Sequence, residues 1–533
     1  MEIVFAFYWF AVLGLFAYGM NCYWLTLSYR RNKRQNEARI ARVRERFHSC
    51  RKDEDLPTVT VQLPVYNERW VVGRLIHAIA RLDYPRTKLQ VQVLDDSTDD
   101  TSSIVERAVE LARAEGLDIE HLRRPNRAGF KAGALRDAMH RSRGELVAIF
   151  DADFVPRPDY LRETVPFFDQ PEVGLVQCRW GHVNEGYSAL TRAQAIAIDG
   201  HFGIEQAGRA WGGYLLNFNG TAGVWRRRAI EDAGGWQVDT LTEDLDLSYR
   251  AQLAGWRIEF LPDVEVPAEI PVDISSFKAQ QRRWAKGSIQ TAIKLLPRVF
   301  RAPIGFARKV QAVLHMTHYL VHPLMLTVAL LSVPLLAFWS GRWGPLPFAL
   351  LLVLLVLATA GPSTLYLSAQ RALRPDWLRR MARMPMLLVL GTGIAVSNSR
   401  AVFEAIVGIE SGFVRTPKHN VVRARSECSA SRRGYRIPFG GLLFFEVFLA
   451  GYSWLGLALY LHAEKYLIGP YLLLYASGFS FMAIASVREI VAIKRAHADV
   501  GAEGADSDPL AGSADAYHAA LASSESASLA RSA

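Results

Sequence analysis

Two acidic clusters are the residues of this sequence that are best suited to chemistry. The first, Asp151-Ala152-Asp153, follows an apolar run at 146–150, and the second, Thr242-Glu243-Asp244, precedes the motif Gln280-x-x-Arg283-Trp284. Carboxylate oxygens are hard ligands that hold Mg²⁺ or Mn²⁺ against a diphosphate. A second carboxylate can take a proton, an arginine suits phosphate oxygens, and a tryptophan face suits a sugar ring. Together these groups predict sugar transfer from a nucleotide donor.

Both clusters also have a purely structural explanation. A D-x-D pair often caps a helix or a turn, and Thr242 followed by two acids is typical of the first turn of a helix. Because the first cluster follows a strand end, a ligand-binding role is favoured for it. Asp153 would then bind the metal ion, and Asp151 would bind the sugar or the ribose. For the second cluster, the functional alternative is that Asp244 abstracts a proton from the acceptor hydroxyl.

The elements around these residues predict an α/β domain. β-rich runs at 58–63, 89–94 and 146–150 alternate with helical stretches at 71–82 and 101–115, which predicts a parallel, doubly wound sheet. Ligands of such sheets bind beyond the carboxyl ends of the strands. The polar motifs that follow the three strands should therefore meet at one edge. They are Tyr66-Asn67-Glu68, Asp95-Asp96 and Asp151-Ala152-Asp153.

Three further motifs have both a functional and a structural interpretation. Asp95-Asp96 can face a base or ribose, although the segment that they begin is rich in turn-forming residues. Lys131 can reach a diphosphate or can be a solvated surface lysine, and its flanking glycines favour the first role. The Gln280 motif lies on one helical turn, which suits a phosphate and a sugar but also suits a core tryptophan beside a surface arginine.

Apolar segments on both sides of this domain predict a membrane protein. Residues 3–27 are long enough to span a bilayer. A signal peptide is the alternative, but Glu2 precedes the run and a basic segment at 30–34 follows it, which favours a retained anchor with its basic flank in the cytoplasm. Further spans are predicted at about 311–340, 345–368, 438–463 and 466–487.

The apolar segment at 385–407 is interpreted differently. Its second half carries Arg400 and Glu404, and basic residues flank it on both sides. Charges are costly at bilayer depth, and two cytoplasmic flanks do not allow a single crossing. We therefore predict an interfacial or re-entrant helix. His315, His318 and His322 share a stripe of one predicted span, where a polar lining or an interhelical contact is favoured over a metal site.

Composition excludes several other classes. The net charge of +10 comes mostly from the basic flanks of the apolar segments, not from the basic groove with aromatics that nucleic-acid binding requires. The four cysteines are scattered and indicate neither a disulfide framework nor a zinc site. Residues 496–533 are rich in Ala, Ser, Gly and Asp, which predicts a disordered tail.

The chain resembles inverting family 2 glycosyltransferases of the cellulose-synthase type, and most of all the plant cellulose-synthase-like A and C proteins. The resemblance is strong over roughly 57–300 and extends in layout to 490. The stretches that carry it are Val61-Gln62-Leu63-Pro64-Val65-Tyr66-Asn67-Glu68, Val93-Leu94-Asp95-Asp96-Ser97-Thr98-Asp99, Phe130-Lys131-Ala132-Gly133-Ala134-Leu135, Phe150-Asp151-Ala152-Asp153-Phe154 and Phe218-Asn219-Gly220-Thr221-Ala222-Gly223. A further segment, Phe413-Val414-Arg415-Thr416-Pro417-Lys418, is similar to the gating loop of bacterial cellulose synthase.

The resemblance implies a role for each site residue. The general base would be Asp244, and Mg²⁺ or Mn²⁺ would bind Asp153 and Asp151. The donor would be bound by Asp95, Asp96, Lys131, Asp151, Asp153, Gln280 and Arg283. The acceptor would be bound by Trp284, Asn219, Gly220 and Glu243. The gating loop would act through Phe413, Thr416 and Lys418.

The resemblance also implies a GT-A fold inserted in a helical transmembrane region, and an enzyme of the inner cell membrane with a cytoplasmic catalytic domain. We expect a processive β-hexosyltransferase that extends a β-glucan or (gluco)mannan from UDP-glucose or GDP-mannose. Accessory export subunits are possible partners, and nucleic acid is not one. The alternative is a non-processive glycolipid synthase similar to ceramide glucosyltransferase. The expected boundaries are an anchor at 1–30, a basic linker at 31–56, the catalytic domain at 57–300, two spans at 301–370, the interfacial helix and gating loop at 371–437, two spans at 438–490 and a cytoplasmic tail at 491–533.

Overall fold

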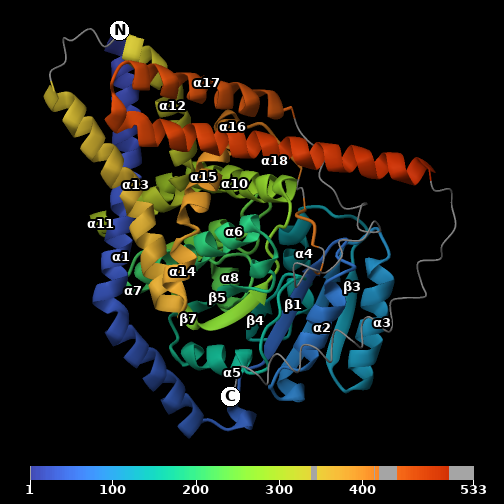
Figure 1. Cartoon of the computed structure of the whole chain (residues 1–533). Coiled ribbons are helices and arrows are strands. Elements are labelled where there is room, and N and C mark those ends of the chain that lie inside the picture. Colours follow the sequence, from blue (N-terminus) through green and yellow to red (C-terminus); the bar gives the residue numbers. More distant parts are fainter. Residues whose placement is uncertain (1, 338–344, 413–414, 419, 421–440, 503–533) are drawn as a thin grey trace. The chain divides into compact units, whose positions relative to one another are not determined.

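The computed structural model describes residues 2–337, 345–412, 415–418, 420 and 441–502. Its contacts divide the chain into two units, Met1–Ser486 and Val487–Ala533. In the first unit, a long helix precedes a sheet domain, and further apolar helices follow it (Figure 1). In the second unit, the described residues are the end of helix α18. The disordered tail was predicted at 491–533, but residues 491–502 belong to this helix, and residues 503–533 lie outside the described residues.

The described residues form a seven-stranded sheet in the order β3-β2-β1-β4-β6-β5-β7. Neighbouring strands from β3 to β4 are parallel, and so are β5 and β7, whereas β6 is antiparallel to both of its neighbours. The predicted α/β class is confirmed, but the wholly parallel sheet is wrong. The strand that reverses has only four residues and is too short to give a periodic pattern. The strands are β1 Val59–Val65, β2 Leu89–Asp95, β3 Asp118–Arg123, β4 Leu146–Ile149, β5 Val173–His182, β6 Gly223–Arg226 and β7 Arg257–Ala268.

The central strands are buried along their whole length, as expected for parallel strands with both faces covered. Polar residues that alternate along them pair across the sheet. Thr60 donates to Gln90 at 2.8 Å, and the Gln62 carboxamide donates to that of Gln92 at 3.0 Å. These bonds offset part of the penalty of burying polar groups, although Oε1 of Gln62 and Nε2 of Gln92 have no hydrogen-bond partner among the described residues.

Helix α1 (Glu2–Cys50) runs along one side of the first unit in Figure 1. Its second half, where we expected a linker at 31–56, is helical to residue 50 and is attached to the sheet domain. Arg39 pairs with Glu259 at 2.6 Å. In the first half, Gly19 faces α13 so closely that a Cβ there would lie 2.6 Å from the Cα of Ala358. Small residues allow this close helix contact.

The helices around and after the sheet match most of the predicted segments. The predicted span at 311–340 differs, because α11 ends at residue 316 and α12 begins at 321. The described α-helices are α1, α2 Val72–Ala80, α3 Thr101–Ala114, α4 Phe130–Ala138, α5 Tyr160–Thr164, α6 Ala189–Gly200, α7 Ala207–Trp211, α8 Arg227–Asp232, α9 Glu243–Leu253, α10 Ile274–Arg301, α11 Phe306–Met316, α12 Val321–Ala337, α13 Pro345–Leu373, α14 Trp377–Met381, α15 Met384–Gly393, α16 Ala395–Val407, α17 Leu443–His462 and α18 Gly469–Ala502.

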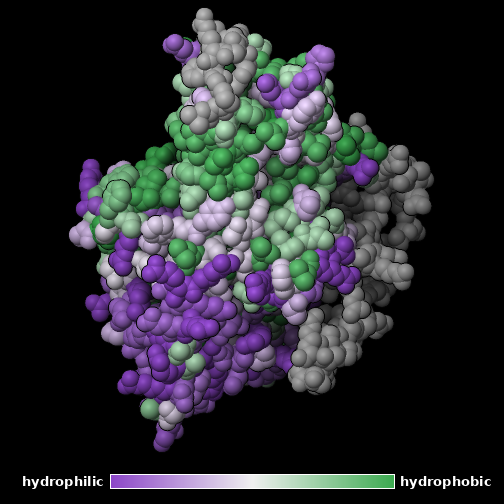
Figure 2. Space-filling view, turned by 60° about the vertical axis from the view of Figure 1, so that its left-hand side comes forward, coloured by the Kyte–Doolittle hydropathy of each residue, from purple (hydrophilic) through white to green (hydrophobic). Residues whose placement is uncertain are grey.

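Within the described ranges, six helical segments are long and apolar enough to cross a membrane, judged by length and composition. Five correspond to the predicted crossings, and the sixth, Trp377–Val407, contains the segment at 385–407 that we predicted to be interfacial. Figure 2 shows hydrophobic residues gathered in the upper part of one face and hydrophilic residues in the lower part. Large apolar side chains such as Phe10 on α1 and Phe444 on α17 are mostly exposed. This surface suits a bilayer better than water.

Candidate active site

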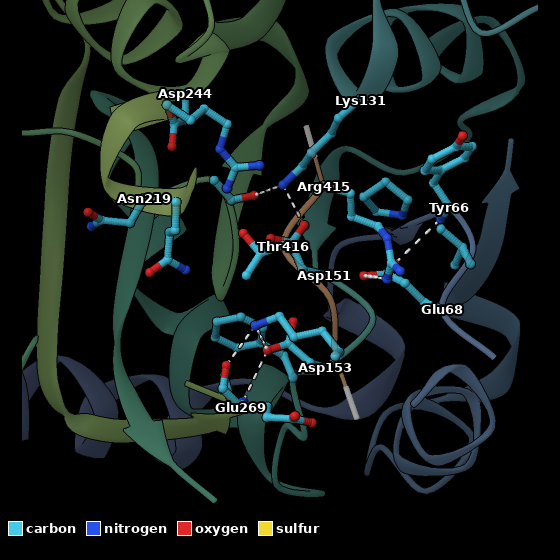
Figure 3. Close-up of a pocket in the computed structure, with 18 of the residues that line it drawn as sticks. Tyr66, Glu68, Lys131, Asp151, Asp153, Asn219, Asp244, Glu269, Arg415 and Thr416 are labelled. Atoms are coloured by element: carbon cyan, nitrogen blue, oxygen red, sulfur yellow. Dashed lines mark hydrogen bonds and ion pairs between the residues drawn. The ribbon is translucent and has the colours of Figure 1, made fainter. Parts of the chain in front are cut away.

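One pocket lies at the carboxyl ends of β1, β2 and β4 (Figure 3). Tyr66 and Glu68 follow β1, Asp96 follows β2, and Asp151 and Asp153 follow β4. These strands are neighbours in parallel register, so their ends deliver the three polar motifs to the same edge of the sheet. The convergence that we predicted from the sequence is confirmed.

The two acids at the carboxyl end of β2, Asp95 and Asp96, have different surroundings. Asp96 lines the pocket, and Arg124 holds both of its oxygens at 2.9 and 2.6 Å. Asp95 is not among the pocket-lining residues and is buried beneath them. Burial alone would raise the pKa of Asp95, but hydrogen bonds from His121 and Ser97 hold it at about 2. The structure therefore brings Asp96 to the pocket and directs Asp95 into the fold.

Two arginines at this end of the pocket were not predicted from the sequence. Arg127 lines the pocket, and its guanidinium carbon lies 3.4 Å from the centroid of the Tyr66 ring. Arg124 forms the pair with Asp96 and also donates to the carbonyl of Phe130 at 3.0 Å. Both arginines follow β3, a strand that our sequence analysis missed. Had 118–123 been recognised as a strand, the same strand-end argument would have indicated them.

The first acid of the D-x-D pair is bound by a lysine from α4. Nζ of Lys131 lies 2.5 Å from Oδ1 of Asp151 and 2.8 Å from the carbonyl of Gly220. Burial would lower the pKa of Lys131, but the negative charges of Asp151 and Glu243 raise it above its usual value. Lys131 is therefore a cation held among acids inside the pocket, and the alternative of a solvated surface lysine is excluded.

The second acid of the pair is deeper. Oδ2 of Asp153 accepts a hydrogen bond from the backbone N–H of Glu269 at 3.0 Å and one from Nζ of Lys418 at 2.7 Å. Lys418 also donates to the carbonyl of Glu269 at 2.6 Å. The link to Glu269, at the end of β7, was not predicted, because nothing local in the sequence indicates it.

A divalent cation fits the chemistry of this pair. Asp151 and Asp153 offer hard carboxylate oxygens, and each already carries a lysine ammonium, so the position attracts positive charge. Among the described residues, no group of three or more His, Cys, Asp or Glu side chains is arranged to hold a metal ion. Two carboxylates are the usual protein contribution to a Mg²⁺ site that is completed by phosphate and water.

The described part of the predicted gating loop closes one side of the pocket. Arg415 pairs with Glu68 at 3.8 Å, and Thr416 is buried at the pocket wall (Figure 3). Burial raises the pKa of Glu68 to about 7, against the lowering effect of Arg415. With Lys418 on Asp153, the loop contacts two of the three strand-end motifs. The predicted loop residue Phe413 lies outside the described residues.

The predicted base Asp244 lies in the first turn of α9 and lines the pocket. Burial and the charge of Glu243 raise the pKa of Asp244 above its usual range. The backbone N–H of Leu245 donates to its Oδ1 at 2.8 Å. Gly220 has a φ of +81°, and a Cβ there would lie 3.0 Å from Oδ2 of Asp244. Glycine therefore allows this loop to approach the carboxylate closely.

The start of α9 differs from the prediction in one respect. We expected Thr242 to cap the helix, but its side chain makes no capping hydrogen bond. Its hydroxyl lies 3.1 Å from that of Thr291 on α10 instead. A Cβ on Gly287 would lie 2.5 Å from the methyl group of Thr242, so α10 is packed directly on the start of α9. This packing of α10 on the start of α9 brings Asp244 and the Gln280-x-x-Arg283-Trp284 motif to the same pocket.

The α10 motif lines the pocket as predicted. Gln280, Arg283 and Trp284 project from one turn of the helix. Asn219 and Gly220 border the same space from the loop before β6. The predicted donor and acceptor residues thus meet in one pocket, with Asp95 as the exception.

A second, larger cavity adjoins this pocket and lies among the apolar helices. It is lined by side chains from α1, α12, α13 and other helices, and the three predicted histidines belong to its wall. Those histidines make interhelical or local contacts, such as the 2.8 Å bond between His315 and Tyr249. Seven residues line both spaces: Trp180, Ile198, Asn219, Thr242, Asp244, Gln280 and Trp284. The predicted base and the predicted acceptor groups therefore lie at the junction of the two spaces.

Comparison with known proteins identifies the sheet domain. Residues 57–287 match the family described as "Glycosyltransferase like family 2". The chain is 41% identical over 281 residues to glucomannan 4-beta-mannosyltransferase 2 of Arabidopsis thaliana, covering 51% of this chain and 53% of that protein. It is 44% identical over 253 residues to the probable glucomannan 4-beta-mannosyltransferase 10 of the same plant, with 46% of each covered. The chain thus spans about half the length of the curated relatives it matches.

Among solved structures, the chain is similar to the mannosyltransferase PcManGT from Pyrobaculum calidifontis in complex with GDP-Man and Mn²⁺. The identity is 23% and the TM-score 0.45, covering 74% of this chain and all of that one. The family 2 match confirms the resemblance inferred from the sequence, and with the mixed sheet it gives residues 57–287 the GT-A fold.

Proposed function

Since residues 57–287 match the family described as "Glycosyltransferase like family 2", we propose that this protein is a membrane-bound, inverting and processive β-hexosyltransferase. The plant relatives are named for β-4-mannosyl transfer to glucomannan. Their names favour mannose over glucose as the transferred sugar, and so GDP-mannose over UDP-glucose as the donor. The acceptor is then a growing mannan or glucomannan chain.

The strand-end half of the pocket suits the donor. Asp96, held by Arg124, faces the nucleoside, and Lys131 and Arg283 face the diphosphate, whose negative charge grows as the sugar departs. Asp151 and Asp153 would hold Mg²⁺ or Mn²⁺, which would supply charge neutralisation at the leaving diphosphate. The gating-loop residues Thr416 and Lys418 then close over the donor.

The α9 and α10 side of the pocket suits the acceptor. Trp284 offers an aromatic face to the terminal sugar, and Asn219, Gly220 and Glu243 surround its hydroxyl groups. Asp244 accepts the proton of the hydroxyl as that oxygen attacks the anomeric carbon, and the diphosphate leaves from the opposite face, so the configuration inverts. A raised pKa suits Asp244 for holding this proton at neutral pH.

One observation carries the proposal of processivity, which is the junction of the pocket with the larger cavity. A chain whose terminal hydroxyl lies at Asp244 would be next to the space among the apolar helices, because Asp244 lines both spaces. A polymer can therefore remain bound while successive sugars are added. A cytoplasmic catalytic domain at the inner cell membrane, with the boundaries expected from the sequence and export subunits as possible partners, belongs to the same proposal.

The test is product formation by membranes that contain the protein, given labelled GDP-mannose or UDP-glucose with Mn²⁺ or Mg²⁺. Ethanol-insoluble product from GDP-mannose that β-mannanase digests would support the proposal. Insoluble product from UDP-glucose that β-glucanase digests would identify glucose as the transferred sugar and leave the proposed mechanism unchanged. Label only in the lipid-soluble fraction would overturn processive synthesis and indicate a glycolipid synthase.

A further inference from the structure

A short π-helix, η6 (His201–Gln206), interrupts the helical run between α6 and α7 beside the site. π-turns inside helices are uncommon and are frequent at functional sites. This one places His201 and Glu205 in the wall of the larger cavity, where Asn219 also lies. Neither His201 nor Glu205 belongs to the motifs that indicated the site.

His201 connects Glu205 to Asn219. Its Nδ1 lies 3.0 Å from Oε2 of Glu205, and its Nε2 lies 3.0 Å from Oδ1 of Asn219. Both partner atoms are oxygens that accept, so each ring nitrogen of His201 lies where it can donate to one of them when it carries a proton. Burial would raise the pKa of Glu205, but the hydrogen bond and charge of His201 and the charge of Arg209 hold it well below its usual value. The Glu205 carboxylate is thus ionised beside the imidazole ring.

The carboxamide of Asn219 is oriented by these contacts. Its Oδ1 accepts from His201 and also from the side chain of Asn217 at 3.0 Å, and its backbone N–H donates to Gln177 at 3.0 Å. Its Nδ2 is buried and has no hydrogen-bond partner among the described residues. An amide nitrogen left without a partner at a cavity wall retains its capacity to donate. Asn219 borders both the pocket and the larger cavity.

Glu205, which contacts His201, is connected to the apolar helices by further polar contacts. Arg209, whose side chain is 1% exposed, binds Oε1 of Glu205 at 3.2 Å and the carbonyl of Gln311 on α11 at 3.3 Å. Gln311 in turn donates to the side chain of Asn21 on α1 at 2.8 Å. A chain of polar contacts therefore holds His201 against the helices that line the cavity.

We propose that His201, backed by Glu205, is a positioning residue that orients the carboxamide of Asn219 so that its N–H groups bind a hydroxyl of the acceptor chain. The proposal rests on the proposed function. Here Asn219, held by His201, fixes the position of the acceptor. Donor binding and the proton transfer to Asp244 do not depend on His201. The geometry separates the two roles, because His201 lines only the larger cavity and Asp244 lines both.

The experiment measures two rates on purified full-length protein with GDP-mannose. One is donor hydrolysis without acceptor, and the other is transfer to a β-1,4-linked manno-oligosaccharide. We expect His201→Ala to raise the KM for the oligosaccharide about five- to tenfold, as loss of one neutral hydrogen bond from Asn219 to the acceptor predicts. Donor hydrolysis should stay within about twofold. His201→Gln, whose amide can donate to Asn219, should recover most of the acceptor affinity.

A double-variant comparison separates positioning from general stabilisation. If His201 acts through Asn219, the His201→Ala/Asn219→Ala protein should be no worse for the acceptor than Asn219→Ala alone. His77→Ala, on the exposed side of α2, is the matched control and should match the wild type. An unchanged oligosaccharide KM in His201→Ala, equal loss of hydrolysis and transfer, or additive effects in the double variant would overturn the positioning role. Failure of the wild type to hydrolyse or transfer from either donor would instead overturn the proposed function.

Discussion

Nζ of Lys418 lies 2.7 Å from Oδ2 of Asp153, although 265 positions separate them in the sequence. The contact places a cation from the described part of the gating loop on the carboxylate that we propose as a metal ligand. The same ammonium donates to the carbonyl of Glu269. The lysine and a divalent ion would therefore compete for the same oxygen, which leads to the first prediction.

We expect Lys418→Met to bind Mn²⁺ about tenfold more tightly than the wild type in the absence of donor, because loss of a charge-assisted hydrogen bond frees the Asp153 carboxylate. Titration of Mn²⁺ followed by electron paramagnetic resonance on the purified protein would measure it. Lys33→Met, on the exposed side of α1, is the control and should not change the affinity. Equal or weaker Mn²⁺ binding in Lys418→Met would contradict the competition.

Removal of divalent ions should abolish sugar transfer, because the leaving diphosphate then lacks charge neutralisation. Chelation followed by graded return of Mn²⁺ or Mg²⁺ would give the half-saturating concentration. Asp153→Asn should raise that concentration at least about tenfold, since the amide oxygen carries no net charge. Asp159→Asn, an exposed residue paired with Arg157, should leave it unchanged. Full transfer activity in a chelator would falsify metal dependence.

Asp244→Asn should lower transfer by about 10²- to 10⁴-fold, the usual contribution of a general base. Donor binding, measured by calorimetry with GDP-mannose, should be retained, because Asp244 lies on the acceptor side of the pocket. The pH dependence of transfer should also reflect the ionisation of Asp244. A base acts only when ionised, so a raised pKa moves the loss of activity to a higher pH than an ordinary aspartate would give. Asp239→Asn, exposed and paired with Lys294, is the control; substantial turnover in Asp244→Asn would remove the assignment.

Glu68→Gln should stabilise the protein at pH 8 and have little effect at pH 4. The folded-state pKa of Glu68 is raised to about 7, above its value of about 4.3 in an unfolded chain. Its contribution to stability is therefore fully present below pH 4.3 and is lost as the pH rises through 7. The difference at pH 8 should be on the order of 1–3 kcal/mol, reduced by the lost pairing with Arg415. Thermal unfolding at both pH values would measure it, with the exposed Glu231→Gln as control; a lower melting temperature at pH 8 would contradict it.

Trp284→Ala should reduce chain elongation much more than donor hydrolysis. The indole borders both the pocket and the larger cavity, where it would stack on a sugar of the acceptor. Product length on a gel and hydrolysis without acceptor would be compared, and Trp284→Phe should restore part of the length because it keeps an aromatic face. An equal loss of both rates would argue against contact with the acceptor.

Much of the site followed from local sequence patterns. A buried strand followed by polar residues, repeated at 58–63, 89–94 and 146–150, predicts where Tyr66, Asp96 and Asp151 lie, because the carboxyl ends of neighbouring parallel strands share an edge. The helical turn that carries Gln280, Arg283 and Trp284 was predictable for a similar reason, since residues three and four apart face the same side. The family resemblance added roles to these positions, and it alone indicated Asn219, Gly220 and the gating-loop residues.

Other features depend on contacts between distant segments. Asp95 and Asp96 are adjacent and equally acidic, yet their contacts differ. His121 on β3 binds Asp95, whereas Arg124, the residue after β3, binds Asp96, and only Asp96 lines the pocket. The four-residue strand β6 is too short to show a period, and only its pairing with β4 and β5 defines its direction.

The sequence by itself determined the α/β domain, the apolar helices around it and the acids at the strand ends, because backbone periodicity and hydrophobic burial act over short stretches of chain. Only the tertiary structure decided that Lys418 reaches Asp153, that His201 contacts Asn219, and that the pocket adjoins the larger cavity. Each of these joins side chains from separate elements, and their distance depends on how whole helices and strands pack, which no local pattern encodes.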